Sequence, residues 1–207
     1  MFQNRYQAGQ LLGEELKKRG YGKNCIILAI PRGGVVTGKA VADILGAKLD
    51  VVVVRKLGAP PQPELAVGAV GPGGIRVINQ NLINSFGLDS QDLENMVSIL
   101  EEEIKEREEK FRSGKRHLIL KNKIVILVDD GIATGATIEA ALEYIKSKKP
   151  LQVVLAAPVA SADTLMHLEM LVDSLVVLEK PVEFGSMGQF YGEFPQVTDE
   201  EVVQLLL

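Results

Sequence analysis

Short runs of hydrophobic residues, rich in β-branched side chains, alternate along the chain with segments of helical periodicity. Apolar residues fill nearly every position of these runs, as they do in strands that are covered by helices on both faces of a sheet. The runs lie at residues 25–30, 49–55, 124–129, 153–157 and 175–178. Strands that alternate with helices are typical of βαβ units, so we expect a doubly wound α/β fold with a mainly parallel sheet.

Apolar residues recur at three- and four-residue spacing between these runs, which predicts amphipathic helices. Two helices are expected at residues 7–19 and 35–45, each followed by a glycine that suits the position after a helix end. A longer helix, at residues 88–111, carries a dense set of charges that we interpret as a solvent-exposed face. A short final helix is expected from about Asp199.

Two stretches lack both periodicities. Residues 57–74 contain Pro60, Pro61, Pro63 and Pro72 together with several glycines, which exclude a long helix or a central strand. We expect a flexible loop there, with a short strand near residues 66–70, and residues 57–65 are a candidate lid over a ligand. Residues 180–207 are interpreted as a small C-terminal hood and tail, so the 207 residues form a single domain.

Composition and charge narrow the classes of function. The chain is 46% hydrophobic and 24% charged, an ordinary globular composition. Its 27 acidic and 23 basic residues leave a net charge of -4, which provides no overall positive field for nucleic acid or a membrane surface. No signal-peptide pattern or membrane-spanning run is visible, and the single cysteine, Cys25, lies in an apolar run. We therefore expect a cytoplasmic protein in which any phosphate binding is local.

The most informative segment is VDDGIATGAT, residues 128–137, which joins a hydrophobic run to a helical pattern. Ligands of open α/β sheets bind at such junctions. Glycines at 131 and 135 let backbone amides approach an anion, and the start of the next helix supplies free N–H groups. The hydroxyls of Thr134 and Thr137 are further possible donors. The pattern predicts a monophosphate site made by Gly131, Ile132, Ala133, Thr134, Gly135, Ala136 and Thr137.

Two adjacent carboxylates, Asp129 and Asp130, directly precede this anion site. Because like charges repel, the ligand should also carry hydroxyl groups that donate to the carboxylates. A ribose 5-phosphate meets both requirements. The alternative is a strand-to-helix turn that is merely rich in small residues.

The segment ILVDDGIATGATI, residues 126–138, resembles the 5-phosphoribosyl 1-pyrophosphate signature of the type I phosphoribosyltransferases. PRGG at residues 31–34 occupies the place of that family's pyrophosphate loop, and Arg55 and Lys56 end the second hydrophobic run. The pieces RKLGAP, PELAVGAV, FY and TDEEV also recur in similar phosphoribosyltransferases, so the resemblance covers nearly the whole chain. It implies Mg²⁺-dependent transfer of the phosphoribosyl group to a nitrogenous, nucleobase-like acceptor, with release of pyrophosphate.

The resemblance also implies roles for individual residues. Asp129 and Asp130 would hold the ribose hydroxyls, residues 132–137 the 5-phosphate, and a basic and glycine-rich set the pyrophosphate. That set is Arg32, Gly33, Gly34, Arg55 and Lys56. Asp130, as a proton acceptor, and Lys56 are the catalytic candidates, and Mg²⁺ would be held mainly through the substrate. For the two arginines the alternative is ion pairing with surface acids.

The acceptor is expected beneath the hood, where Phe184, Phe190 or Tyr191 would stack on a planar base. The same aromatic residues would serve equally well as the core of the hood. The expected partners are the donor, this acceptor and, as an open possibility, a second copy of the chain, with no nucleic acid and no membrane.

Two other functions stay open from the sequence. Residues 33–39, GGVVTGK, satisfy the GxxxxGK pattern of P-loop nucleotide hydrolases, but Ala40 stands where that loop needs a hydroxyl for Mg²⁺. Val35, Val36 and Val41 fit instead the buried stripe of a helix. The second alternative is a non-catalytic regulator that binds 5-phosphoribosyl 1-pyrophosphate.

Overall fold

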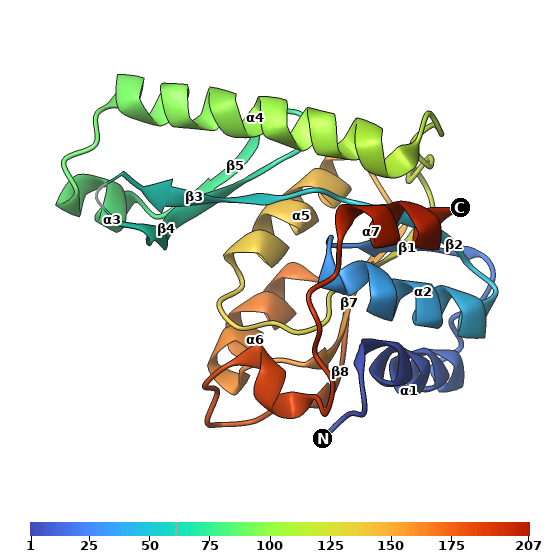
Figure 1. Ribbon diagram of the computed structural model, residues 1–207. Coiled ribbons are helices and arrows are strands. Elements are labelled where there is room, and N and C mark those ends of the chain that lie inside the picture. Colours follow the sequence, from blue (N-terminus) through green and yellow to red (C-terminus); the bar gives the residue numbers. More distant parts are fainter. Residues whose placement is uncertain (61) are drawn as a thin grey trace.

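The computed structural model describes residues 1–60 and 62–207. Its main sheet consists of five parallel strands in the order β2-β1-β6-β7-β8 (Figure 1). They are β1 (Cys25–Ala29), β2 (Lys48–Val51), β6 (Ile124–Val128), β7 (Gln152–Val159) and β8 (Ser174–Glu179). Each strand overlaps a predicted hydrophobic run, so the expected parallel α/β fold is confirmed, although β2 ends at Val51, before the end of its run.

Helices cover both faces of this sheet because side chains alternate along each strand. Ile27 packs in one buried cluster with Leu12 and Val41, whereas its neighbour Leu28 packs in another with Ile138. The first cluster lies under α1 and α2, and the second under α5 and α6. These helices are α1 (Arg5–Lys18), α2 (Gly33–Leu45), α5 (Ala136–Ser147) and α6 (Ala162–Leu168), and η1 (Glu169–Leu171) extends the last. The doubly wound arrangement is thus the observed one.

A second sheet of three antiparallel strands lies beneath a long helix, α4 (Figure 1). This unit contains β3 (Arg55–Ala59), β4 (Gln62–Gly71), β5 (Ile75–Ile78), α3 (Gln80–Ser85) and α4 (Ser90–Arg112). The expectation of a loop over residues 57–74 is therefore wrong for the described residues, and the short strand near 66–70 is part of β4. Pro60 and Pro72 are accommodated because they lie in the turns at the two ends of β4.

The candidate lid at residues 57–65 includes Pro61, which lies outside the described residues. Leu57 and Ala59 are buried in the cluster under α4. Closure of this segment over a bound donor stays a prediction. If it closes, hydrogen exchange at Leu57 and Gly58 should slow when Mg²⁺ and donor are added, and equal exchange rates with and without ligand would contradict a lid.

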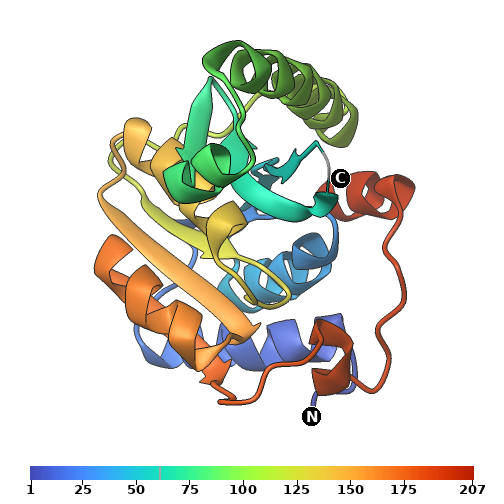
Figure 2. The same cartoon turned by 90° about the vertical axis from the view of Figure 1, so that its left-hand side faces the viewer.

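The last residues of the chain form three parts, and Figure 2 shows the first of them, the hood, beside the N-terminus. The hood comprises residues 180–191 and contains η2 (Met187–Phe190), and α7 (Asp199–Leu206) packs against α2 and α4. We call the connection between them, residues 192–198, the C-terminal strap. Phe2 anchors the hood, since its N–H donates to the carbonyl of Phe190 (2.8 Å) and its carbonyl accepts from the N–H of Gly192 (2.8 Å). Across the described residues, no helix has the length and apolar character needed to cross a bilayer.

Candidate active site

The predicted phosphate segment leaves β6 and enters α5 at the carboxyl edge of the main sheet. Gly135 has φ of +83°, in the left-handed region, and a Cβ there would lie 3.0 Å from the Thr164 methyl group. The Thr164 hydroxyl donates to the carbonyl of Ala133 (2.6 Å), and the N–H of Ile132 donates to the carbonyl of Val159 (2.9 Å). The loop is thereby held on α6 and β7.

The first turn of α5 offers backbone amides to this loop. Its N-cap is Gly135, which has no side chain to cap those amides. Ala133 and Thr134 are exposed, and Thr137 is half-buried. The geometry therefore suits an anion at the start of α5, as the sequence predicts.

The two carboxylates lie directly beside this loop and are largely buried. Asp129 Oδ1 accepts the backbone N–H of Asp130 (2.8 Å). Burial, and after it the neighbouring Asp130 carboxylate, raises the pKa of Asp129 well above its usual range. Asp130 Oδ2 is 2.6 Å from Nε of Arg5, and the exposed fractions of these two side chains are 16% and 10%. The acidic pair therefore includes one carboxylate that is already ion-paired.

Arg5 is a site residue that sequence reasoning missed. It lies in the first turn of α1, and no local pattern marks it because its partner Asp130 is 125 positions away. Its Nη1 donates to the carbonyl of Pro195 (2.7 Å), and its guanidinium carbon lies 3.5 Å from the centre of the Phe194 ring. Only the tertiary fold brings these groups together.

The PRGG segment packs on the acidic pair, as its assignment to the same site requires. A Cβ on Gly33 would overlap Oδ2 of Asp130 and lie 2.8 Å from Nε of Arg5. A Cβ on Gly34 would lie 2.8 Å from Oδ1 of Asp129. Both glycines open α2, and the Pro31–Arg32 peptide bond before them is cis. The start of α2 and the loop after β6 thus form one site.

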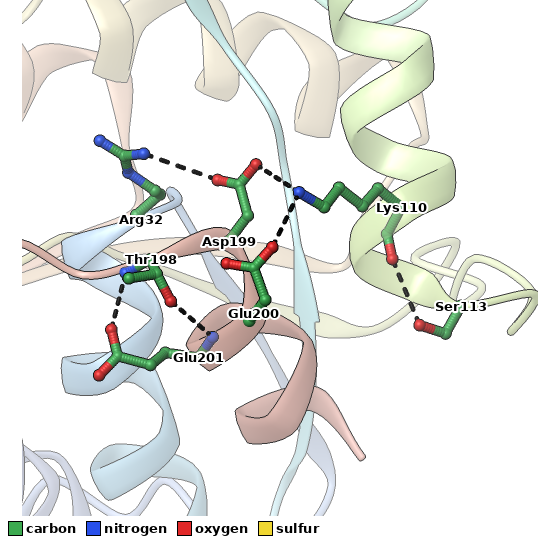
Figure 3. Close-up of polar contacts among 7 residues, drawn as sticks. All are labelled: Arg32, Lys110, Ser113, Thr198, Asp199, Glu200 and Glu201. Atoms are coloured by element: carbon green, nitrogen blue, oxygen red, sulfur yellow. Dashed lines mark hydrogen bonds and ion pairs between the residues drawn. The ribbon is translucent and has the colours of Figure 1, made fainter.

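Arg32 makes an ion pair with the C-terminal helix. Its Nη1 is 3.7 Å from Oδ1 of Asp199, whose other oxygen is 2.9 Å from Nζ of Lys110 on α4 (Figure 3). The hydrogen bond from Lys110 lowers the pKa of Asp199. The side chain of Arg32 is still 35% exposed. Ion pairing with an acidic residue, the alternative considered for Arg32, is therefore observed for its side chain. The backbone of Arg32 still belongs to the PRGG segment beside the acidic pair.

Arg55 and Lys56 are placed differently from the prediction. The strand β2 ends at Val51, and the two cations open β3 in the second sheet. Arg55 is paired with Glu103 of α4 (Nη2 to Oε2, 2.8 Å), and Lys56 is exposed. Among the described residues, neither side chain bonds to the acidic pair or to PRGG. Any contact of these two side chains with pyrophosphate stays a prediction.

The hood aromatics divide into two groups. Tyr191 is buried, its ring stacks on Phe194 with 4.9 Å between centroids, and its hydroxyl donates to the backbone carbonyl of Asp130. The core alternative is therefore favoured for Tyr191. Phe184 and Phe190 are half-buried against each other, with 5.1 Å between their centroids, and they stay candidates for an acceptor.

The GGVVTGK segment is helical from Gly33 onward and is not a phosphate loop. Lys39 lies on the exposed side of α2, where its Nζ is 2.6 Å from Oδ1 of Asp43, one turn away. A P-loop needs its backbone N–H groups to cradle phosphate in a turn before the helix. This geometry removes the structural basis for a P-loop nucleotide hydrolase.

Comparisons with known proteins identify the family of this chain. The family model described as "Phosphoribosyl transferase domain" matches residues 6–186. A Mycobacterium tuberculosis protein named "Putative phosphoribosyl transferase" is 40% identical over 206 residues, which are 100% of this chain but 46% of that protein. The chain therefore spans about half the length of the curated relatives it matches.

Two solved structures place the fold. The crystal structure of the protein TT1426 from Thermus thermophilus is 40% identical, with a TM-score of 0.84 over 100% of this chain and 97% of that one. A hypoxanthine phosphoribosyltransferase from Staphylococcus aureus shares the fold alone, at 14% identity and a TM-score of 0.50 over 87% and 74% of the two chains. Because the family model matches most of the length of this chain, the chain belongs to the phosphoribosyl transferase domain family.

Proposed function

We propose that the chain is a phosphoribosyltransferase that uses 5-phosphoribosyl 1-pyrophosphate as donor and a nitrogenous, nucleobase-like molecule as acceptor. The observation that carries the proposal is the acidic pair Asp129 and Asp130, which lies between the glycines of PRGG and the uncapped start of α5. A ligand with hydroxyl groups between two phosphate groups matches this order of acceptors and donors. Family membership supports the same activity.

Each part of the donor has a counterpart in the site. The ribose hydroxyls donate to the acidic pair, and the 5-phosphate accepts from the first amides of α5 and the hydroxyls of Thr134 and Thr137. The pyrophosphate accepts from the backbone at Gly33 and Gly34 and from the guanidinium of Arg32. That guanidinium would first have to turn from Asp199.

The transfer itself needs no covalent intermediate with the protein. The bond from C1 of the ribose to pyrophosphate oxygen breaks, and its electron pair leaves with the pyrophosphate. The lone pair of the acceptor nitrogen forms the new bond to C1, and that nitrogen loses its proton, for which Asp130 is the acceptor expected from the sequence. Rigid binding of both ends of the donor and exclusion of water by the hood would supply much of the rate.

Mg²⁺ fits this site as a companion of the donor. Among the described residues, no three His, Cys, Asp or Glu side chains gather as a metal site. Mg²⁺ prefers six oxygen ligands and often combines water with substrate phosphates, so the donor would provide most of its ligands. When bound, Mg²⁺ neutralises charge on the departing pyrophosphate.

Donor binding should be visible as thermal stabilisation. At a donor concentration of 100 times Kd, with Mg²⁺ present, the Tm should rise by about 5–10 °C, because the ligand binds only the folded chain. The double variant Asp129→Asn, Asp130→Asn should lose most of this rise, whereas Lys39→Ala, on the exposed side of α2, should keep it. A flat titration of the parent up to millimolar donor would refute the proposal.

The acceptor can be identified by a screen of purines, pyrimidines and related heterocycles with donor and Mg²⁺. Pyrophosphate release together with the mass of the nucleotide product would establish the transfer. Stabilisation by the donor without release for any acceptor would favour the regulator over the enzyme.

A further inference from the structure

Arg5 is the least exposed cation of the site, and its guanidinium contacts three other residues. The residue is only 9% exposed, although it lies in the first turn of a terminal helix. Its Nε donates to Asp130, its Nη1 donates to Pro195, and its planar face lies on Phe194. The two hydrogen bonds and the ring contact hold the guanidinium in one orientation, because rotation of its plane would break both bonds.

Asp130 is correspondingly held from several sides. Its Oδ2 accepts from Arg5, its backbone N–H donates to Asp129, and its backbone carbonyl accepts from Tyr191. The Oδ1 atom makes no hydrogen bond with any residue that the structure describes, and 16% of the side chain is exposed. The carboxylate therefore has one oxygen that is bound by Arg5 and one that has no hydrogen bond to a described residue.

We propose that Arg5 is a positioning residue for the donor, which fixes Asp130 through Oδ2 and leaves Oδ1 to accept a ribose hydroxyl. This inference rests on the proposed function, in which Asp130 binds the ribose. The charge of Arg5 also offsets the repulsion between two neighbouring carboxylates.

The C-terminal strap holds Arg5 in place. Phe194 and Pro195 both belong to the strap, and Phe194 also stacks on Tyr191 of the hood. Arg5 itself comes from the other end of the chain. Residues from both ends of the chain therefore contribute to the proposed donor site. A substitution in the strap should weaken donor binding by displacing Arg5.

The test compares Arg5→Gln with Arg19→Gln, which removes an exposed ion pair from the same helix region (Arg19 Nε to Glu15 Oε1, 2.9 Å). Arg5→Gln should weaken donor binding in the presence of Mg²⁺ by about 10- to 100-fold, as expected for loss of a charged hydrogen bond. Its KM for the donor should rise, while its KM for the acceptor stays near the parent value. Arg19→Gln should match the parent in both. A merely structural role would lower the Tm without this split between the two KM values.

Two further variants decide the matter if Arg5→Gln does not fold. Arg5→Lys keeps the charge but cannot reach Asp130 and Pro195 together, so it should also bind the donor more weakly than the parent. Phe194→Leu removes the ring beneath the guanidinium and should give a smaller defect of the same kind. Folded variants at Arg5 with the parent's affinity for the donor would overturn the inference, whereas a parent chain that binds no donor would overturn the proposed function instead.

Discussion

Replacing Gly33 with alanine should lower the rate of phosphoribosyl transfer by about 100-fold or more while the chain stays folded. The added methyl group would overlap Oδ2 of Asp130 and lie 2.8 Å from Nε of Arg5, so the ion pair at the centre of the site must shift. A displacement of about 1 Å in a site that holds reactants rigidly is enough for a loss of this size. Folding should survive because Gly33 is at the first position of α2, where alanine is a good helix former.

The rate is measured as pyrophosphate release with saturating donor, alongside the Tm of each variant. Gly22→Ala is the matched control, since its Cβ would meet no atom within 4 Å and its φ is outside the left-handed region. It should keep both the rate and the Tm of the parent. Parent-like turnover by Gly33→Ala would show that the contact between PRGG and Asp130 does not matter for the reaction.

Replacing Arg112 with methionine should lower the free energy of unfolding by about 3–5 kcal/mol. Arg112, Asp50 and Glu108 form a buried ionic cluster that joins the end of α4 to β2. Arg112 Nε is 2.9 Å from Oδ1 of Asp50, its Nη2 donates to the carbonyl of Val51 (2.7 Å), and its Nη1 is 3.4 Å from Oε1 of Glu108. Without the guanidinium, two buried carboxylates would have no cation between them.

Denaturation in urea measures this change, with Lys39→Met as the control. Lys39 and Asp43 form an ion pair of comparable length (2.6 Å), but their side chains are 36% and 45% exposed, so its loss should cost less than about 1 kcal/mol. Equal losses in the two variants would mean that the Arg112 cluster is screened like a surface pair. Donor binding should be unchanged in Lys39→Met, because Lys39 is outside the site.

Strands β1, β6 and β7 of the main sheet could be predicted because each is buried along nearly its whole length and appears as a continuous hydrophobic run. Strands β2 and β8 are only partly buried, but each overlaps a hydrophobic run. The segment at residues 128–137 could be placed at a strand end for the same reason, since its glycines follow such a run directly. These features depend on neighbouring positions in the chain. Local pattern was therefore sufficient for the fold class and for the family resemblance, which the comparison confirms.

Where a strand ends depends on its partner, and here the local pattern misled. Ala29 and Val51 are the last pair between β1 and β2, so β2 stops there although Val52, Val53 and Val54 are also buried. Those three valines lie in the same hydrophobic run but are buried outside the main sheet, in the clusters that also contain residues of the second sheet and its helices. Arg55 consequently lies in another sheet from the one predicted.

Only the tertiary structure decided how the acidic pair is held. Arg5 and Asp130 are 125 positions apart. From the far end of the chain, the carbonyl of Pro195 in the strap accepts from Arg5, and the Tyr191 hydroxyl donates to the backbone carbonyl of Asp130. A guanidinium in a first helical turn has no periodicity that distinguishes it from an exposed one. Its burial and its partner follow from the packing of the two chain ends on the main sheet, so the sequence alone could predict the acidic pair but not the residue that positions it.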